Sequence, residues 1–385
     1  MRILSITGNR ADYDLMSYLY RYFNRDPDID FGLVVTGGHL TVNYGSSMED
    51  IRADGNRVVA EIEDILNSGH SASRAKAVGI LTQSLTDVVR SFRPDILIAP
   101  GDREDVLAAA AVALYMQVPF LHFFAGDQDD SGHVDNLVRH AASKIATAHF
   151  VSCEEHKKRL LCMGEEEARI FNVGSVALDK FKEEPVLSKE KVLKSLGLRD
   201  FENYALLIYH PPAEIVGENL EIEAIMRTLS EKRIKTVVSY PNTDFGNQAI
   251  LEKYARYKDD PNFYFYKNLS RKLFVNLYRH AMFQIGNSSA GVCEAASIPI
   301  PVVNVGSRES GRGNTENVIF VRDHREGLSE AVERAMSAEY RASIKDVRNI
   351  LGDGHSSRRA YEVIKSVDFS RMLLKKYDPL TGESL

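Results

Sequence analysis

Three aspartates stand out as groups suited to acid–base chemistry: Asp102, Asp127 and Asp135. The first two follow apolar runs that predict neighbouring strands, and the third opens a predicted helix. Carboxylates that face one another raise each other's pKa, which suits proton transfer on a sugar. Arg139 lies four residues after Asp135, on the same helix face. This spacing predicts either a local ion pair or carboxylates and a guanidinium held around a substrate.

A second stretch, residues 286–294 (Gly-Asn-Ser-Ser-Ala-Gly-Val-Cys-Glu), is suited to binding phosphate. Apolar residues lead into it and small residues follow, which predicts a strand, a turn and a helix start. Backbone N–H groups at a helix start form a phosphate cradle together with the hydroxyls of Ser288 and Ser289. Glu294, one helical turn on, suits a ribose hydroxyl pair. The plain alternative is a capped strand-to-helix turn, because Ser and Gly favour such turns generally.

The elements that must position these residues alternate between strand and helix. The predicted strands are apolar on both faces, which is typical of a parallel sheet covered on both sides. A chain of 385 residues exceeds the usual size of one core, so two domains are expected. A charged segment with a proline, residues 180–194, predicts a linker between them that runs into a solvated helix. The fold class is therefore α/β with two doubly wound, Rossmann-like domains, and a ligand is expected in the cleft between them.

Polar clusters follow many of the predicted strands. They lie at residues 9–12, 37–39, 102–104 and 126–128 in the first half, and at 210, 240–242, 287–289 and 306–312 in the second. Solvated loops explain any one of them, whereas eight clusters on one predicted rim favour a binding site. Neither GxGxxG nor GxxxxGK[ST] occurs, so a dinucleotide-binding domain or a P-loop is not supported.

Composition excludes several classes of function. The net charge of −6 argues against nucleic acid or a membrane surface as partner. No signal peptide or membrane-spanning run is present, and the three cysteines show no CxxC spacing, so a cytoplasmic protein with reduced thiols is expected. The spacings of His133, His140, His149 and His156 match no metal motif. We expect no metal and no cofactor.

Taken together, the motifs resemble the UDP-N-acetylglucosamine 2-epimerase family, and specifically its hydrolysing branch. The matching segments in the first half are residues 8–13, 101–103, 135–144 and 172–175. Those in the second half are residues 210–211, 240–242, 286–294 and 306–312. They occur in family order across about residues 1–320, which makes the set specific although each motif alone is weak.

The resemblance implies a GT-B arrangement of the two Rossmann-like domains. Residues 1–178 would form the sugar-side domain, completed by a C-terminal helix at about 366–385. Residues 179–365 would form the UDP-binding domain. The implied partner is a UDP-sugar substrate. The sequence carries no interface signature, and a homo-oligomer is left open.

Site roles follow from the same resemblance. The catalytic set would be Asp102, Asp127 and Asp135, with His210 stabilising the departing diphosphate. The binding set would be Arg10, Arg103, Arg139, His140, Asn242, Asn287, Ser288, Ser289, Glu294, Arg308 and Arg312. One carboxylate would take the C2 proton while the anomeric C–O bond breaks, and water would then add to the 2-acetamidoglucal.

Two departures from the family pattern lie on the sugar side. The family's Gly-Gly-Glu turn is here Ala125-Gly126-Asp127, so the carboxylate is one methylene shorter and Gln128 is an alternative partner for the glutamate. Pro212 follows His210-Pro211 where relatives often carry a polar residue.

The resemblance implies a hydrolysing 2-epimerase that converts UDP-N-acetylglucosamine, or a UDP-2,4-diacetamido-2,4,6-trideoxy sugar, to a free N-acetylmannosamine-type sugar. Such a product would feed sialic or legionaminic-type acid synthesis. The apolar Phe124 would tolerate the missing hydroxyl of the deoxy sugar. The alternatives are a non-hydrolysing 2-epimerase, a GT-B glycosyltransferase and an inactive sugar-nucleotide sensor.

Overall fold

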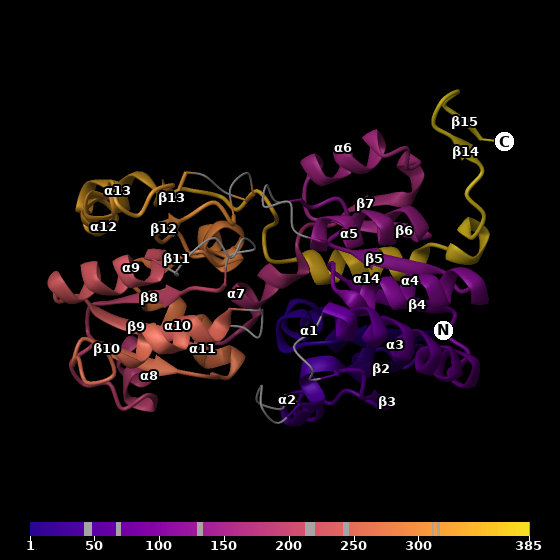
Figure 1. Ribbon diagram of the computed structural model, residues 1–385. Helices are drawn as coiled ribbons and strands as arrows, with labels where there is room; N and C mark the ends of the chain where they lie inside the picture. The colour runs from indigo at the N-terminus through magenta and orange to yellow at the C-terminus, as the bar shows by residue number, and fades with distance from the viewer. Residues whose placement is uncertain are drawn as a thin grey trace. The chain divides into compact units, whose positions relative to one another are not determined.

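The structure is a computed structural model that describes residues 1–41, 48–66, 71–128, 134–211, 220–241, 246–309, 312–313 and 316–384. These residues form two compact units (Figure 1). The first unit contains the residues up to Gln128, those from 134 to Asp179 and those from Gly354 on. The second contains Lys180–Asp353. Within the described part of the chain, no helix combines the length and the apolar character needed to cross a bilayer.

The first unit is built on a seven-stranded parallel sheet with the order β3-β2-β1-β4-β5-β6-β7. Its strands are β1 (Arg2–Thr7), β2 (Asp30–Thr36), β3 (Val58–Ile62), β4 (Ile96–Pro100), β5 (Phe120–Phe123), β6 (Ala148–Val151) and β7 (Ile170–Asn172). Its helices are α1 (Arg10–Arg25), α2 (Met48–Ala53), α3 (Ser71–Phe92), α4 (Glu104–Met116), α5 (Val134–Ile145), α6 (Glu154–Cys162) and α14 (Ser356–Ser366). Short 3-10 turns are η1 (Gly37–Leu40), η3 (Glu167–Arg169), η4 (Val176–Asp179) and η7 (Phe369–Met372), and β14 (Tyr377–Asp378) pairs with β15 (Glu383–Ser384).

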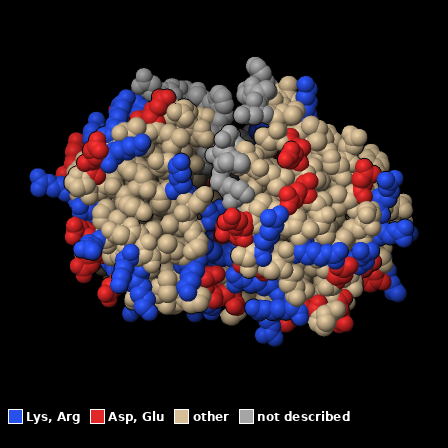
Figure 2. Space-filling view, turned by 90° about the horizontal axis from the view of Figure 1, so that it is seen from below, with Lys and Arg blue, Asp and Glu red and all other residues tan. Residues whose placement is uncertain are grey.

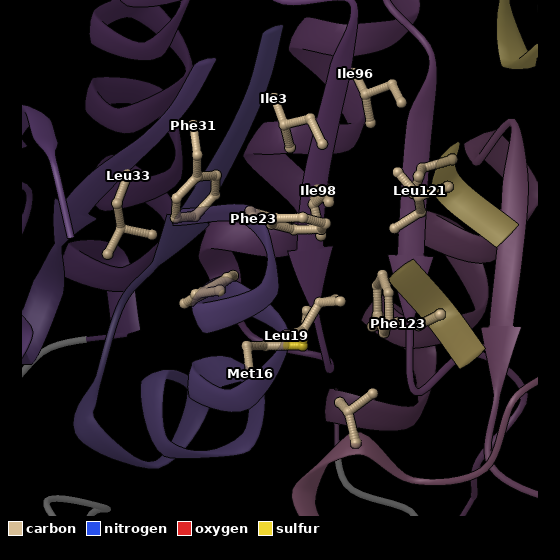
Figure 3. Packing of buried hydrophobic residues seen from close by; sticks show 14 of the residues in the cluster. Ile3, Met16, Leu19, Phe23, Phe31, Leu33, Ile96, Ile98, Leu121 and Phe123 are labelled. Atoms are coloured by element: carbon tan, nitrogen blue, oxygen red, sulfur yellow. The ribbon is translucent and has the colours of Figure 1, made fainter. Parts of the chain in front are cut away.

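Helices cover both faces of this sheet. Successive strand residues point to opposite sides, so Ile3 belongs to a core beneath α1 while Leu4 belongs to a second core beneath α3 and α4. Figure 3 shows Met16, Leu19 and Phe23 of α1 directed at the strands, at the spacing of one helix face. The chain returns to this core through α14, whose first N–H groups are capped by the Asp179 carboxylate, at 3.0 Å from Ser356 N and 2.7 Å from Ser357 N.

The second unit repeats the design with six parallel strands in the order β10-β9-β8-β11-β12-β13. These are β8 (Tyr204–Ile208), β9 (Lys235–Ser239), β10 (Phe263–Tyr266), β11 (Gln284–Gly286), β12 (Val302–Val305) and β13 (Val318–Val321). Its helices are α7 (Lys180–Glu183), α8 (Lys189–Ser195), α9 (Leu220–Glu231), α10 (Asn247–Ala255), α11 (Arg271–His280), α12 (Leu328–Met336) and α13 (Ala338–Ser343). This is the strand order of a doubly wound sheet, so the predicted α/β class with two Rossmann-like sheets is confirmed.

The prediction for residues 180–194 holds for the solvated helix, because α8 exposes Glu190, Lys191 and Lys194, but it is wrong for the start of the segment. This segment forms α7 and α8, and both Lys180 and Phe181 are buried. It is bound to α11, because the Asn276 amide donates to Pro185 O at 2.9 Å and accepts from Leu187 N at 2.8 Å. Lys180 pairs with Glu294, whereas most of the other charged side chains of the segment are exposed, as the composition suggested. The functional division into residues 1–178 and 179–365 stays a prediction.

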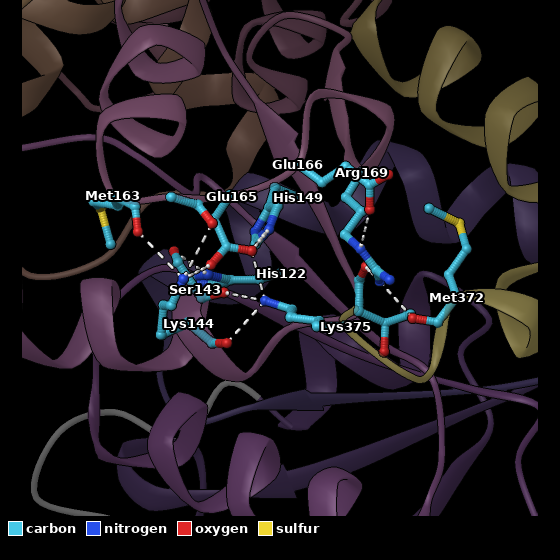
Figure 4. A network of polar contacts seen from close by, with 12 residues as sticks. His122, Ser143, Lys144, His149, Met163, Glu165, Glu166, Arg169, Met372 and Lys375 are labelled. Carbon is cyan, nitrogen blue, oxygen red and sulfur yellow. Dashed lines mark hydrogen bonds and ion pairs between the residues drawn. The ribbon is translucent and has the colours of Figure 1, made fainter. Parts of the chain in front are cut away.

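Charge is distributed without a one-sign surface on the face seen in Figure 2, where basic and acidic side chains are intermingled. A different kind of charge cluster lies inside the first unit (Figure 4). The Glu165 carboxylate, 1% exposed, pairs with His149 Nε2 at 2.9 Å, Lys144 Nζ at 2.8 Å and Lys375 Nζ at 2.6 Å. Arg169 in the same network donates to the carbonyl oxygens of Met372 and Leu374. These contacts attach the C-terminal segment to β6 and α5.

We expect Glu165→Gln to lower the free energy of unfolding by about 2 kcal/mol at neutral pH, because charge-assisted hydrogen bonds are lost. Burial would raise the pKa of Glu165, but the hydrogen bond from His149 and the charge of Lys375 outweigh it and hold the pKa at about 2. Since this lies below the ordinary value of 4.5, the stabilisation is present above that pH and disappears as the pH falls toward 2.

Urea denaturation of wild type and variant at about pH 7 and about pH 4 measures this difference. The matched control is Glu167→Gln, whose side chain is 70% exposed and should change the unfolding curve little at either pH. An equal loss at both pH values for Glu165→Gln would show that packing, and not the carboxylate charge, stabilises this cluster.

Candidate active site

The loops after β1, β2, β4 and β5 of the first unit meet at the carboxyl edge of the sheet. Gly37 has φ +60°, and a Cβ there would lie 2.4 Å from Gly8 O. Gly38 N donates to the same oxygen at 2.8 Å. The loop after β4 is held by His122, whose Nε2 donates to Gly101 O at 2.8 Å and whose Nδ1 accepts from Ser143 Oγ at 3.0 Å. Burial lowers the pKa of His122 to about 4, so this imidazole is neutral when it holds the residue before Asp102.

Arg139 joins the predicted carboxylate loops. Its guanidinium forms an ion pair with the Asp102 carboxylate and donates to Asp127 O at 3.0 Å and Asn136 Oδ1 at 3.1 Å. The arginine side chain is 4% exposed while that of Asp102 is 21% exposed, so the carboxylate faces outward from a buried cation. The contact spans 37 residues of sequence, which makes Arg139 more than the partner in a local helix pair.

Asp127 is fixed through its side chain as well. Its Oδ1 accepts from Gln128 N at 2.8 Å and lies 3.3 Å from His156 Nε2. Gln128 is exposed, and its amide oxygen lies 3.4 Å from His140 Nε2. Burial lowers the pKa of His140, with the charge of Arg139 adding to the effect. Asp127 is therefore the more buried and the more firmly held of these two residues.

Two further acids lie beneath the first loop. Burial raises the pKa of Asp105 to about 7. Burial also raises the pKa of Asp12 well above its usual range, and the charges of Asp105 and Asp135 add to this. A Cβ at Gly8 would lie 3.1 Å from the Asp105 carboxyl, so a larger residue there would require that carboxyl to shift by a few tenths of an ångström. The site thus holds two buried carboxyls with raised pKa values beside the half-buried Asp135.

The predicted cationic residues Arg10 and Arg103 begin or precede helices at the same edge. Arg10 opens α1 and its guanidinium lies 3.7 Å from Asp50 Oδ2, with 35% of the side chain exposed. Arg103 is the residue before α4 and is half-buried. Arg103 supplies positive charge near Asp12 and Asp105, and positive charge at this edge suits an anionic substrate.

The predicted phosphate turn of the second unit is shaped by Gly286. Its φ is +137°, and a Cβ there would lie 2.0 Å from Ile208 O, so only glycine allows β11 to approach the end of β8. Asn287 then locks the two loops together: its amide oxygen accepts from His210 N at 2.8 Å and its amide nitrogen donates to His210 O at 2.9 Å. His210 and Asn287, predicted separately, are one unit of structure.

The turn that follows is not the regular helix that the sequence predicts. A π-helical turn, η5 (Ala290–Glu294), is followed by a 3-10 turn, η6 (Ala295–Ser297). Tyr278 from α11 holds it by donating to Ala290 O at 3.0 Å. Ser288 Oγ accepts from Ala290 N at 3.3 Å, whereas Ser289 is exposed. Of the two predicted hydroxyls, one caps the turn and the other faces solvent.

Glu294 is oriented by a residue that the sequence analysis missed. Lys180 Nζ, with a side chain 4% exposed, lies 2.9 Å from Glu294 Oε2. A second missed residue, Glu309, is 2% exposed and binds both predicted arginines, with Arg312 Nη1 at 3.0 Å and Arg308 Nε at 3.7 Å. Arg308 also approaches Pro211 O at 3.5 Å, which brings it to the His210 loop.

The predicted residues thus form two groups. The carboxyl edge of the first sheet carries Asp102, Asp127, Asp135, Arg139, His140, Arg10 and Arg103. The carboxyl edge of the second sheet carries His210, Asn287, Ser288, Ser289, Glu294, Arg308 and Arg312. Asn242 lies outside the described residues. Among the described residues, no group of three or more His, Cys, Asp or Glu side chains is arranged to hold a metal ion.

Comparison with known proteins gives a consistent result. A family model described as UDP-N-acetylglucosamine 2-epimerase matches residues 21–365. The UDP-N,N'-diacetylbacillosamine 2-epimerase (hydrolyzing) of Legionella pneumophila is 34% identical over 377 residues, which cover 97% of this chain and 98% of that protein. The GDP/UDP-N,N'-diacetylbacillosamine 2-epimerase (hydrolyzing) of Campylobacter jejuni is 29% identical over 345 residues, 88% of each chain.

A solved structure agrees with the fold. The crystal structure of UDP-GlcNAc 2-epimerase from Neisseria meningitidis, bound to UDP-GlcNAc, matches with a TM-score of 0.80. The match covers 95% of this chain and 100% of that one, at 18% sequence identity. At such an identity the likeness establishes the architecture of the chain.

Proposed function

Because the chain belongs to the UDP-N-acetylglucosamine 2-epimerase family, we propose that it is a hydrolysing 2-epimerase that releases UDP and a free 2-acetamido sugar of the manno type. The observation that carries the proposal is the Arg139 guanidinium, which holds the Asp102 carboxylate and the backbone of Asp127 at one edge of the sheet. The relatives named as hydrolysing enzymes support the choice of water as the acceptor.

For the substrate, we propose a UDP-2,4-diacetamido-2,4,6-trideoxy sugar ahead of UDP-N-acetylglucosamine. The support comes from the names of the Legionella and Campylobacter relatives. The argument from Phe124 loses weight, because this ring packs against the buried core of the first unit. Arg308 and Arg312, the Gly286 turn and Glu294 are the groups proposed for the diphosphate and ribose.

The proposed reaction begins with anti elimination. A carboxylate of the first unit takes the C2 proton as the anomeric C–O bond breaks, and the electron pair leaves with UDP. Cationic side chains stabilise the charge that develops on the diphosphate. Water then adds to the 2-acetamidoglucal, with its oxygen bonding to C1 and a proton returning to C2 on the opposite face. Asp102 and Asp127, held by Arg139, are the proposed proton-transfer pair, with Asp135 beside them.

Separate incubations with UDP-N,N'-diacetylbacillosamine and UDP-N-acetylglucosamine, followed by ³¹P and ¹H NMR, test the function. We expect release of UDP with a free manno-configured sugar, faster from the diacetamido substrate. Formation of an epimeric UDP-sugar would show a non-hydrolysing enzyme. UDP release that requires an added acceptor would show a glycosyltransferase, and binding of UDP without turnover of either sugar would show a sensor.

A further inference from the structure

We propose that His156 of α6 is a positioning residue that holds the Asp127 carboxylate in its reactive place. The inference rests on the proposed function, and it addresses how an aspartate serves where the family has a glutamate. Asp127 is bound by two helices. Arg139 of α5 donates to its backbone carbonyl oxygen, and His156 of α6 pairs with its side-chain carboxylate.

The imidazole is well placed for this role. His156 Nε2 lies 3.3 Å from Asp127 Oδ1, and the two side chains are 9% and 14% exposed. Cys153, the residue before α6, lies on the same helix end as the ring. Burial alone would lower the pKa of His156, but Asp127 and Cys153 raise it to about 9. The ring is therefore a cation at neutral pH, and it faces the Asp127 side chain.

The backbone of α6 is fitted to the same loop. Gly126 has φ +73°, and a Cβ there would lie 2.4 Å from His156 O, so the loop rests directly on the helix. Arg159, one turn on from His156, donates to Gly126 O and pairs with Glu155 at 2.7 Å. Three contacts on one helix thus fix residues 126 and 127, and only the contact of His156 reaches the carboxylate.

This arrangement compensates for a shorter side chain. A glutamate could extend toward the sugar from a loosely placed backbone, whereas an aspartate must be delivered by the loop itself. Misplacement of a reacting group by about 1 Å can cost about 100-fold in rate. His156 takes no proton from the substrate in this account. It sets the orientation of the group that does.

The test compares His156→Ala and His156→Gln with a control on the same helix, Lys158→Ala, which is exposed. We expect His156→Ala to lower kcat for UDP release by about 100-fold with KM changed by less than about threefold. His156→Gln, which keeps an N–H donor toward Asp127, should recover at least about tenfold of that loss. Lys158→Ala should match wild type.

The rate at which the Cys153 thiol is labelled gives a second measurement. A general loss of structure would speed this labelling, whereas loss of the His156 imidazole alone should slow it. Although burial opposes it, the neighbouring His156 imidazole lowers the pKa of the Cys153 thiol. Iodoacetamide labelling, followed residue by residue by mass spectrometry, should therefore slow at Cys153 in both His156 variants. Labelling of Cys162, which is exposed and on the far end of α6, should not change.

The outcomes separate the two proposals. A wild type that releases UDP while His156→Ala retains kcat within about twofold overturns the role of His156 alone. Equal losses in both His156 variants, with faster labelling of all three cysteines, would indicate a purely structural residue and also overturn it. A wild type that releases UDP from neither sugar overturns the proposed function, and the positioning role with it.

Discussion

Replacing Asp102 by Asn should reduce kcat for UDP release by about 10³-fold, while the Kd for UDP stays within about twofold of the wild-type value. The carboxylate is the most exposed part of the Arg139 cluster and the group we propose to exchange a proton with C2. General acid–base groups contribute about 10²–10⁴-fold in rate. The amide oxygen of Asn still accepts a hydrogen bond from Arg139, so the fold of the loop is retained.

Steady-state kinetics and calorimetry with UDP measure the two quantities. The matched control is Asp95→Asn, which changes an aspartate just before the start of β4, the end opposite Asp102; its carboxylate accepts from Arg2 N at 2.7 Å. Activity of Asp102→Asn above about one tenth of wild type would remove Asp102 from the chemistry. A parallel loss of UDP affinity would instead place it in binding.

Replacing Arg139 by Met should cost both activity and stability. The substitution keeps most of the buried stem but removes the guanidinium that binds Asp102, Asp127 O and Asn136. Two proposed acids lose their common support, so we expect kcat to fall by about 10²-fold or more. Breaking a buried ion pair from one side typically costs about 3–5 kcal/mol. Since Asp102 remains partly solvated, the lower end of that range is expected.

Arg139→Lys distinguishes charge from geometry. Lysine keeps the positive charge but lacks the planar set of donors that reaches three partners at once. We expect its stability to lie between that of wild type and Arg139→Met, with kcat still reduced by at least about tenfold. Urea denaturation and UDP-release kinetics give the two values. Full activity of Arg139→Lys would mean that charge alone is required and would weaken the account of Arg139 as the organiser of the site.

The sequence predicted those features that local rules control. Apolar runs with intervening helices define a parallel sheet wherever they occur, and strand ends in such a sheet must share an edge. That reasoning placed Asp102, Asp127 and Arg139 in one neighbourhood, and the structure joins them through the Arg139 guanidinium. Gly286 was predictable in the same way, because a turn entering a helix favours glycine where backbones approach closely.

Other features depend on contacts between distant segments, which no local pattern reveals. Lys180 belongs to a charged stretch typical of a solvated linker. It is nevertheless buried against Glu294, which lies 114 residues later in the sequence. His156 looked like one of four scattered histidines until the fold brought it to Asp127. The short π-helical turn at Ala290–Glu294 has small residues that also suit an α-helix; its conformation is stabilised by Tyr278 from a neighbouring helix.

Glu309 illustrates an intermediate case. The sequence shows that Glu309 lies beside Arg308 and three residues before Arg312, so ion pairs with them can be predicted. The sequence does not show that Glu309 is buried. Charged residues in a Gly- and Ser-rich loop usually face solvent, so a surface position was the natural prediction for Glu309. The burial of Glu309 could have been predicted from the two arginines, because like charges at a site proposed for a diphosphate need a carboxylate between them.

Proton exchange at C2 tests the central claim most directly. The wild-type enzyme is run to completion in D₂O with the substrate that it turns over, and the released sugar is examined by ¹H NMR and mass spectrometry. Elimination and hydration predict one deuterium at C2 in every molecule of free sugar. A free sugar that retains its C2 proton would mean that the C1–O bond is hydrolysed without any chemistry at C2, and the carboxylate cluster around Arg139 would then need another explanation.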